Sequence, residues 1–133
     1  FDEMVDGLKA DRPHFLAGFG KTFYGAGMLN FDISNELLAW TSQVAMLASP
    51  KATIDCVRAF SETDFREDLR KLTVPTLVIH GDEDQTVPID VSAKRVQEFV
   101  PNAELKVYQG APHGLFFSNK DELNDDLQAF IRR

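Results

Sequence analysis

The sequence predicts an α/β protein in which a helical region precedes a parallel strand–helix–strand unit. Apolar residues recur at helical spacing through residues 1–72, and the pattern changes after Pro75. Residues 76–79 form a continuous β-branched and aliphatic run, and residues 103–108 alternate between apolar and polar side chains. The segment between these runs is long enough for a right-handed crossover that contains a helix. We therefore expect helices over residues 1–72 and a βαβα unit over residues 73–133.

Capping residues mark where the helices of the first region begin. Asp11 can cap a second helix, Ser34 a third, and Ser49 a fourth with Pro50 in its first position. Asp64 can cap a short fifth helix. The apolar residues that we expect to face inward are Phe1, Met4, Val5 and Leu8; Phe15, Leu16, Phe19 and Phe23; Ile33, Leu37, Trp40, Val44 and Leu47; Ile54, Val57 and Phe60; and Phe65, Leu69 and Leu72.

The strands of the second region require neighbours. The run 76–79 lacks alternation, which is typical of a strand that is buried on both faces. A helix capped by Asp90 should follow, then an outer strand at 103–108 and a last helix capped by Asn119. Two parallel strands do not complete a sheet. We therefore expect the chain, which starts at Phe1, to be the C-terminal portion of a larger α/β protein or to bind a partner that completes the sheet.

Composition narrows the class of protein. The net charge of −7 and the pI near 4.8 argue against binding to nucleic acid or to anionic membranes. No apolar run is long enough to span a bilayer, and no signal-peptide pattern is present. The single cysteine, Cys56, which we expect to be buried, fits a cytoplasmic location. No spacing of Cys and His indicates a metal site, and we expect no metal and no cofactor. The oligomeric state is open, with a homo-oligomer as one alternative.

Asp84 and His113 are the candidate catalytic residues. Asp84 comes five residues after Ile79, and His113 comes five residues after Tyr108. Parallel strands end at the same edge of a sheet, where reactive groups of α/β proteins gather. A carboxylate and a histidine in that order are the acid and the base of an acid–base–nucleophile triad. No Gly-x-Ser-x-Gly segment occurs in the 133 residues, so the nucleophile is not part of this sequence.

The segments Leu72–Pro88 and Ala111–Leu115 resemble the C-terminal half of an α/β-hydrolase, most closely the cofactor-free haloperoxidase and aryl esterase branch. Residues 51–57 and 62–66 also fit that branch, within its helical cap. The resemblance implies that residues 1–72 are the cap and that 73–133 carry the triad Asp and His of the core.

The resemblance also assigns roles to single residues. It makes Asp84 the acid and His113 the base, whereas Asp82, the competing carboxylate, falls on a variable turn position. His80 is expected to make a structural hydrogen bond. Candidate substrate contacts are Phe19 and Phe23 from the cap and Thr86 and Val87 after the acid.

The expected function is that of part of a serine-dependent carboxylester hydrolase, with perhydrolase or haloperoxidase activity as an addition. Its substrates would be small-molecule esters or peroxides, and its partner the upstream half of the same fold. Alone the chain would be inactive, because the nucleophile and the oxyanion hole are missing. Two alternatives are open: lactam, epoxide or haloalkane hydrolysis on the same frame, or a non-catalytic half of an assembled sheet. A serine or an aspartate nucleophile would separate acyl transfer from alkyl displacement.

Overall fold

The chain packs as two units in the computed structural model, which describes residues 1–28 and 32–133. The first unit contains Phe1–Lys21 and Asp32–Asp64. The second contains residues 22–28 of the described chain and Phe65–Arg133. Residues 65–72, which we place with the cap on sequence grounds, thus fall in the same unit as the strands.

The first region contains the helices α1 (Asp2–Ala10), α2 (Arg12–Tyr24), α3 (Asn35–Met46) and α4 (Pro50–Glu62). Of these, α2, α3 and α4 begin at predicted capping residues. The Asp11 side chain accepts from the His14 amide at 3.0 Å, and the Ser34 and Ser49 hydroxyls accept from amides three residues on. These three predicted caps are confirmed, because each satisfies an amide that the first helical turn leaves unpaired.

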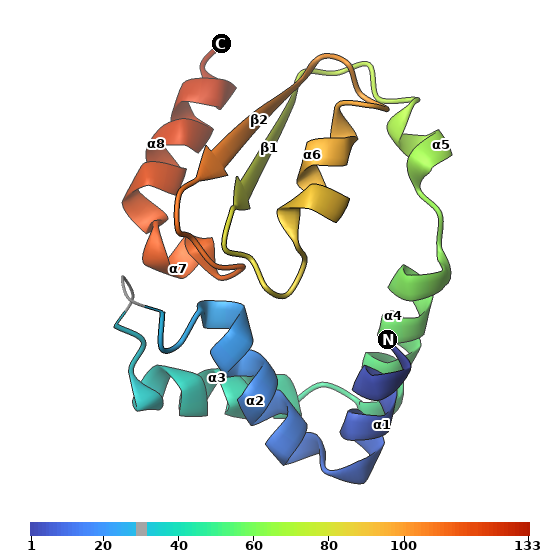
Figure 1. Ribbon diagram of the computed structural model, residues 1–133, viewed down its shortest axis with the longest axis vertical. Coiled ribbons are helices and arrows are strands. Elements are labelled where there is room, and N and C mark those ends of the chain that lie inside the picture. Colours follow the sequence, from blue (N-terminus) through green and yellow to red (C-terminus); the bar gives the residue numbers. More distant parts are fainter. Residues whose placement is uncertain (29–31) are drawn as a thin grey trace. The chain divides into compact units, whose positions relative to one another are not determined.

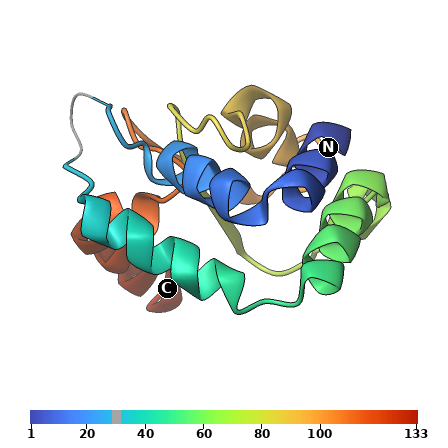
Figure 2. The ribbon, with the colours of Figure 1, turned by 90° about the horizontal axis from the view of Figure 1, so that it is seen from below.

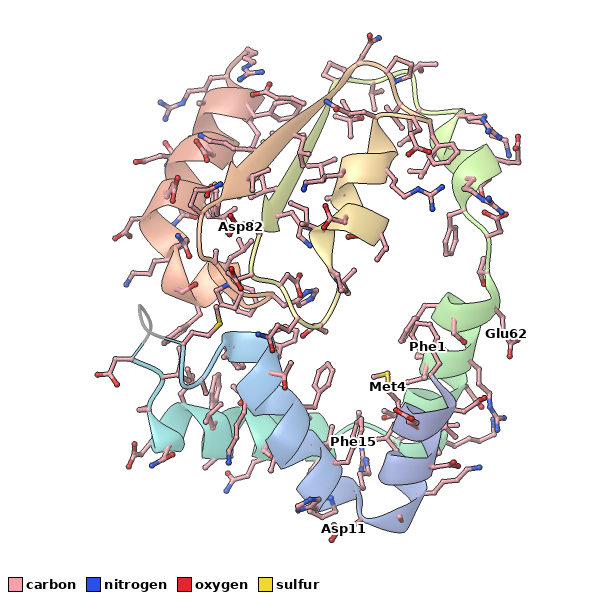
Figure 3. All side chains as sticks on the ribbon, viewed as in Figure 1. Phe1, Met4, Asp11, Phe15, Glu62 and Asp82 are labelled. Carbon is pink, nitrogen blue, oxygen red and sulfur yellow. The ribbon has the colours of Figure 1, made fainter. Side chains whose placement is uncertain are left out.

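The core of the first unit lies between α1 and α4, which run side by side in both ribbon views (Figures 1 and 2). Val5 and Leu8 of α1 are buried against Val57 of α4. Met4 and Phe15, both labelled in Figure 3, are partly buried against this cluster. The helical spacing of the apolar residues in α1 therefore does mark its inward face.

Several predictions of burial are wrong, since the exposed side chains include five more that we expect to face inward: Phe1, Val44, Phe60, Phe65 and Leu72. Trp40 of α3 is 62% exposed and Leu47, which follows that helix, is 86% exposed. Cys56 is also exposed, although its neighbour Val57 is buried. A helical pattern predicts an apolar face, but the face is buried only where another segment covers it. Within the described residues nothing covers Trp40, Leu47 or Cys56.

The strands β1 (Thr76–Gly81) and β2 (Ala103–Tyr108) pair in parallel, as predicted. Thr76 lies opposite Ala103, and Gly81 lies opposite Tyr108. The last residues of the two strands are therefore partners. The loops that follow them leave from the same edge of the sheet.

Helices cover both faces of this strand pair. Leu77 and Ile79 line one cavity with residues of α8 (Lys120–Ile131), and Val78 and His80 line another with residues of α6 (Ala93–Val96). Figure 1 shows α8 and α6 on opposite sides of the strands. Yet residues 76–80 are only half-buried, whereas we predict full burial. Among the described residues β2 is the one strand that pairs with β1, so its other edge lacks the neighbour that would bury it.

The crossover helix and the fifth helix differ from their predictions in where they begin. The predicted crossover helix divides into a 3₁₀ turn, η1 (Ile89–Val91), and α6, because the backbone of Ser92 is not helical. Asp90 contacts Lys94 at 2.6 Å instead of capping. Similarly, α5 (Arg66–Leu69) has Phe65 at its N-cap, not Asp64.

The last two helices follow β2. They are α7 (Leu115–Ser118) and α8, which begins directly after Asn119 as predicted. The Asn119 side chain makes no capping bond and contacts Glu122 instead. Nowhere in residues 1–28 and 32–133 does a helix combine the length and the apolarity needed to cross a membrane.

Polar contacts hold α8 against β2. Tyr108 is 1% exposed, and its hydroxyl donates to Asp126 Oδ2 at 2.5 Å. Lys106 pairs with Asp126 Oδ1. The hydrogen bond from Lys106, followed by that from Tyr108, holds the pKa of Asp126 below its ordinary value, while burial raises the pKa of Tyr108. The buried phenol therefore stays a hydrogen-bond donor.

Candidate active site

The loops that leave β1 and β2 bring Asp84 and His113 together. His113 Nδ1 lies 2.7 Å from Asp84 Oδ2. A carboxylate oxygen only accepts, so Nδ1 carries a hydrogen and donates it. The other ring nitrogen, Nε2, is then the one that can accept a proton. The Asp84 residue is 6% exposed, whereas one third of the His113 side chain is open to solvent.

The loop after β1 satisfies the second oxygen of Asp84. Asp84 Oδ1 accepts from the amides of Thr86 and Val87, both at 2.8 Å. These are bonds to residues two and three positions further along the chain, which Asp and Asn form readily in turns. A buried carboxylate needs such partners because loss of hydration is costly. The turn therefore fixes the carboxylate with Oδ2 directed at His113.

His80, on β1, is the second histidine near Asp84. Its Nε2 lies 2.9 Å from Val87 O and 3.1 Å from Asp84 Oδ2. The bond to the Val87 carbonyl is the structural hydrogen bond that the sequence suggests for this residue. His14, by contrast, is exposed on α2.

The two loops approach closely because Gly81 has no side chain. A Cβ at this position would lie 2.1 Å from Ala111 O, far inside contact distance. The amide of Glu83 donates to the same Ala111 carbonyl at 3.2 Å. Asp82, labelled in Figure 3, accepts from the Gly110 amide at 2.5 Å. The competing carboxylate therefore ties the two loops together, and Asp84 is the carboxylate that contacts the imidazole.

Phe23, near the end of α2, contacts His113 from within the same unit. The ring centroids are 4.7 Å apart, in an edge-on arrangement at 61°. The Gly114 amide donates to Phe23 O at 2.7 Å, which fastens the turn after His113 to this helix end. A Cβ on Gly114 would lie 2.7 Å from the Tyr24 ring. Glycine at 114 thus permits the contact that sets the position of Phe23.

A cavity of about 410 Å³ opens beside the pair. Its lining combines Asp84, His113 and His80 with apolar side chains from β1 and from the helices that follow His113. These are Leu77, Ile79, Leu115, Phe116, Leu123 and Leu127, and Gly81 completes the wall. Because apolar walls with few polar groups are typical of small-molecule sites, the imidazole faces surroundings that suit an apolar substrate.

The four predicted substrate contacts differ in where they lie. Phe23 touches His113. Thr86 and Val87 hold Asp84 through their amides, and the Thr86 hydroxyl is buried without a hydrogen-bond partner in the described part of the chain. Phe19 belongs to the first unit, where its ring stacks on Phe15 at 6.2 Å. A direct role in substrate binding stays a prediction for all four.

The aliphatic residues of the cavity and Gly81 are not predicted as parts of the site from the sequence. The cavity residues belong to strand and helix faces that read as ordinary core. Gly81 does carry a signal, because glycine at the end of an aliphatic strand often marks a close backbone approach. No cluster of three or more His, Cys, Asp or Glu side chains suited to a metal ion occurs among residues 1–28 and 32–133.

The two parallel strands are joined by a crossover, and a carboxylate–imidazole pair lies at their carboxyl ends. This arrangement is typical of α/β hydrolases. The chain belongs to the α/β-hydrolase fold family, whose family model matches residues 34–120. It is 37% identical to the non-heme chloroperoxidase CPO-A1 of Kitasatospora aureofaciens, over 100% of this chain and 49% of that protein. It is 39% identical to the bifunctional esterase/perhydrolase DCH of Acinetobacter calcoaceticus, over 99% of this chain and 48% of that protein.

Solved structures give the same fold. The bromoperoxidase of Bacillus anthracis superposes with a TM-score of 0.94 at 41% identity, over 99% of this chain and 48% of that one. An esterase of Exiguobacterium antarcticum superposes with a TM-score of 0.89 at 29% identity, over 99% and 47%. The chain therefore spans about half the length of the relatives it matches. The predicted relation to the C-terminal part of an α/β-hydrolase fold is confirmed.

Proposed function

We propose that this chain supplies the acid and the base of a Ser–His–Asp triad in a carboxylester hydrolase that also carries out perhydrolysis. The main observation in support of this proposal is the 2.7 Å contact between His113 Nδ1 and Asp84 Oδ2, at the carboxyl ends of two parallel strands. The esterase/perhydrolase and haloperoxidase relatives support the substrate class. The serine and the oxyanion-hole amides would come from polypeptide outside this sequence.

In the proposed reaction, His113 Nε2 takes the proton of the serine hydroxyl as its oxygen attacks the ester carbonyl. The imidazolium then gives that proton to the leaving alcohol, and an acyl-enzyme remains. Asp84 keeps Nδ1 as the donor and stabilises the positive charge on the ring. Water resolves the acyl-enzyme to an acid, and hydrogen peroxide resolves it to a peracid. In either case His113 takes a proton from the incoming oxygen and returns it to serine.

The first test compares the chain alone with the protein in which its upstream segment is restored. The probe is p-nitrophenyl acetate, with and without a serine-directed sulfonyl fluoride. We expect turnover only with the upstream segment, and its loss after treatment with the inhibitor. Turnover by the chain alone that the inhibitor abolishes would contradict the proposal, because this sequence contains no nucleophile elbow.

The second test uses the histidines. His113→Ala in the restored protein should lower kcat by about 10³-fold or more, since loss of a triad base removes both proton transfers. His14→Ala is the matched control, because His14 is exposed on α2 and should leave kcat unchanged. A loss below about tenfold for His113→Ala would assign this residue a structural role instead.

A further inference from the structure

His80 faces two acceptors with the same ring nitrogen. Its Nε2 lies 2.9 Å from the Val87 carbonyl oxygen and 3.1 Å from Asp84 Oδ2. Neither oxygen can donate, so Nε2 carries a hydrogen whether the ring is neutral or protonated. The His80 side chain is only 14% exposed. The hydrogen on Nε2 bonds the Val87 carbonyl, and the nitrogen that carries it lies next to the Asp84 oxygen that His113 also contacts.

His80 is one of four residues that contact the Asp84 carboxylate. Oδ1 has the amides of Thr86 and Val87, and Oδ2 has the rings of His113 and His80. Val87 is held from both sides, because its amide donates to Asp84 while its carbonyl accepts from His80. His80 thus acts on the carboxylate in two ways: it anchors the turn that holds Oδ1, and it places positive potential beside Oδ2.

We propose that His80 is a positioning residue that sets how strongly Asp84 stabilises the charged form of His113. This inference rests on the proposed function, since it concerns the same acid and base. The N–H of His80 draws on the negative charge of Oδ2, and less of that charge is left to favour the imidazolium. His80 therefore limits the share of the Asp84 charge that acts on the His113 ring.

Other charged groups of the described chain lie near His80 and Asp84. Arg66 of α5 and Arg95 of α6 line the same cavity as His80. Asp82 and Glu83 lie in the loop before Asp84, and the Asp82 carboxylate contacts the Gly110 amide. None of these groups changes the requirement for a hydrogen on Nε2, because that requirement comes from the two oxygens that face it.

The experiment compares His80→Phe and His80→Gln in the protein with its upstream segment restored. Phenylalanine keeps a planar ring without the donor, and glutamine places an amide N–H near the position of Nε2. We expect the acid limb of the kcat/KM profile of His80→Phe, measured with p-nitrophenyl acetate, to move to higher pH by about 0.5–1 pH unit. His80→Gln should keep the limb within about 0.2 pH unit of the wild type. If kcat/KM of His80→Phe fell equally at every pH and the acid limb did not move, His80 would only stabilise the loop. That result would overturn the inference.

Two further measurements keep the test decisive. Should His80→Phe fail to fold, ¹⁵N-detected NMR of the wild-type imidazole decides: a hydrogen on Nε2 supports the inference, and a bare Nε2 overturns it. Asp84→Asn and His113→Ala in the same assay separate the two proposals. If both variants keep full activity, the proposed triad fails; if both lose activity and the limb of His80→Phe stays in place, the inference about His80 alone fails.

Discussion

Gly81→Ala tests whether the close approach of the two loops sets the Asp84–His113 geometry. The added Cβ would lie 2.1 Å from Ala111 O and 2.6 Å from Ala111 C, both main-chain atoms that cannot rotate away. Real Cβ contacts essentially never fall below 3.0 Å, so the backbone at Ala111 must retreat by about 0.9 Å. His113 is two residues further along and would move with it.

A displacement of this size should weaken the bond between the acid and the base. The Nδ1–Oδ2 distance of 2.7 Å would lengthen to roughly 3.5 Å, beyond the range of a good hydrogen bond. A misplacement of about 1 Å in a catalytic group lowers the rate by about 10²-fold. We therefore expect kcat/KM of the restored protein to fall about 100-fold with p-nitrophenyl acetate. The free energy of unfolding in urea should drop by about 1–3 kcal/mol, as overpacking does.

Gly18→Ala is the matched control. It adds the same methyl group within α2, where nothing lies within 4 Å of the new Cβ. We expect unchanged kcat/KM and a gain in stability of about 0.4–1 kcal/mol, because alanine restricts the unfolded chain. If Gly81→Ala kept kcat/KM within about threefold of the wild type, the reasoning that links this glycine to the position of His113 would be refuted.

Two other predictions concern stability. The Arg12 guanidinium donates to the carbonyls of Ala45 and Ala48 at 3.1 and 2.8 Å. Arg12→Met should therefore lower the free energy of unfolding in urea by about 1–2 kcal/mol. An unchanged free energy of unfolding would show that these bonds do not stabilise the fold. The pKa of Asp126 is held below its ordinary value of 3.8, first by Lys106 and then by Tyr108. The stability that this carboxylate contributes is complete above about pH 5, where it is ionised in the unfolded chain too, and is lost as pH falls through its lowered folded-state pKa. Asp126→Asn should therefore flatten the acid limb of a plot of unfolding free energy against pH, and an unaltered limb would contradict this assignment.

The sequence predicts the local features of the fold well. Ser34, Ser49 and Asp11 cap helices as expected, because each bond joins residues three positions apart and needs no other part of the chain. The two strands also form as predicted. The first is a continuous apolar run and the second alternates apolar and polar residues, and both patterns can be recognised from neighbouring residues.

Burial and helix length are predicted less well. Trp40 and Leu47 read as an inward face and are exposed, because periodicity cannot say whether another segment covers a helix. The crossover helix divides at Ser92, where the backbone turns away from helical geometry between two short pieces. Burial depends on packing between distant residues, which local propensity does not determine.

The candidate site divides in the same way. By itself the sequence determined that a carboxylate and a histidine follow the ends of two parallel strands. The reason is that the spacing of each residue from its strand can be read along the chain. The tertiary structure alone decided that Asp84 meets the imidazole while Asp82 binds the Gly110 amide, that Phe23 rests on His113, and that His80 shares Asp84. The physical reason is that these contacts join residues far apart in the chain. Their geometry depends on the strand register and on a backbone approach that only glycine at 81 permits.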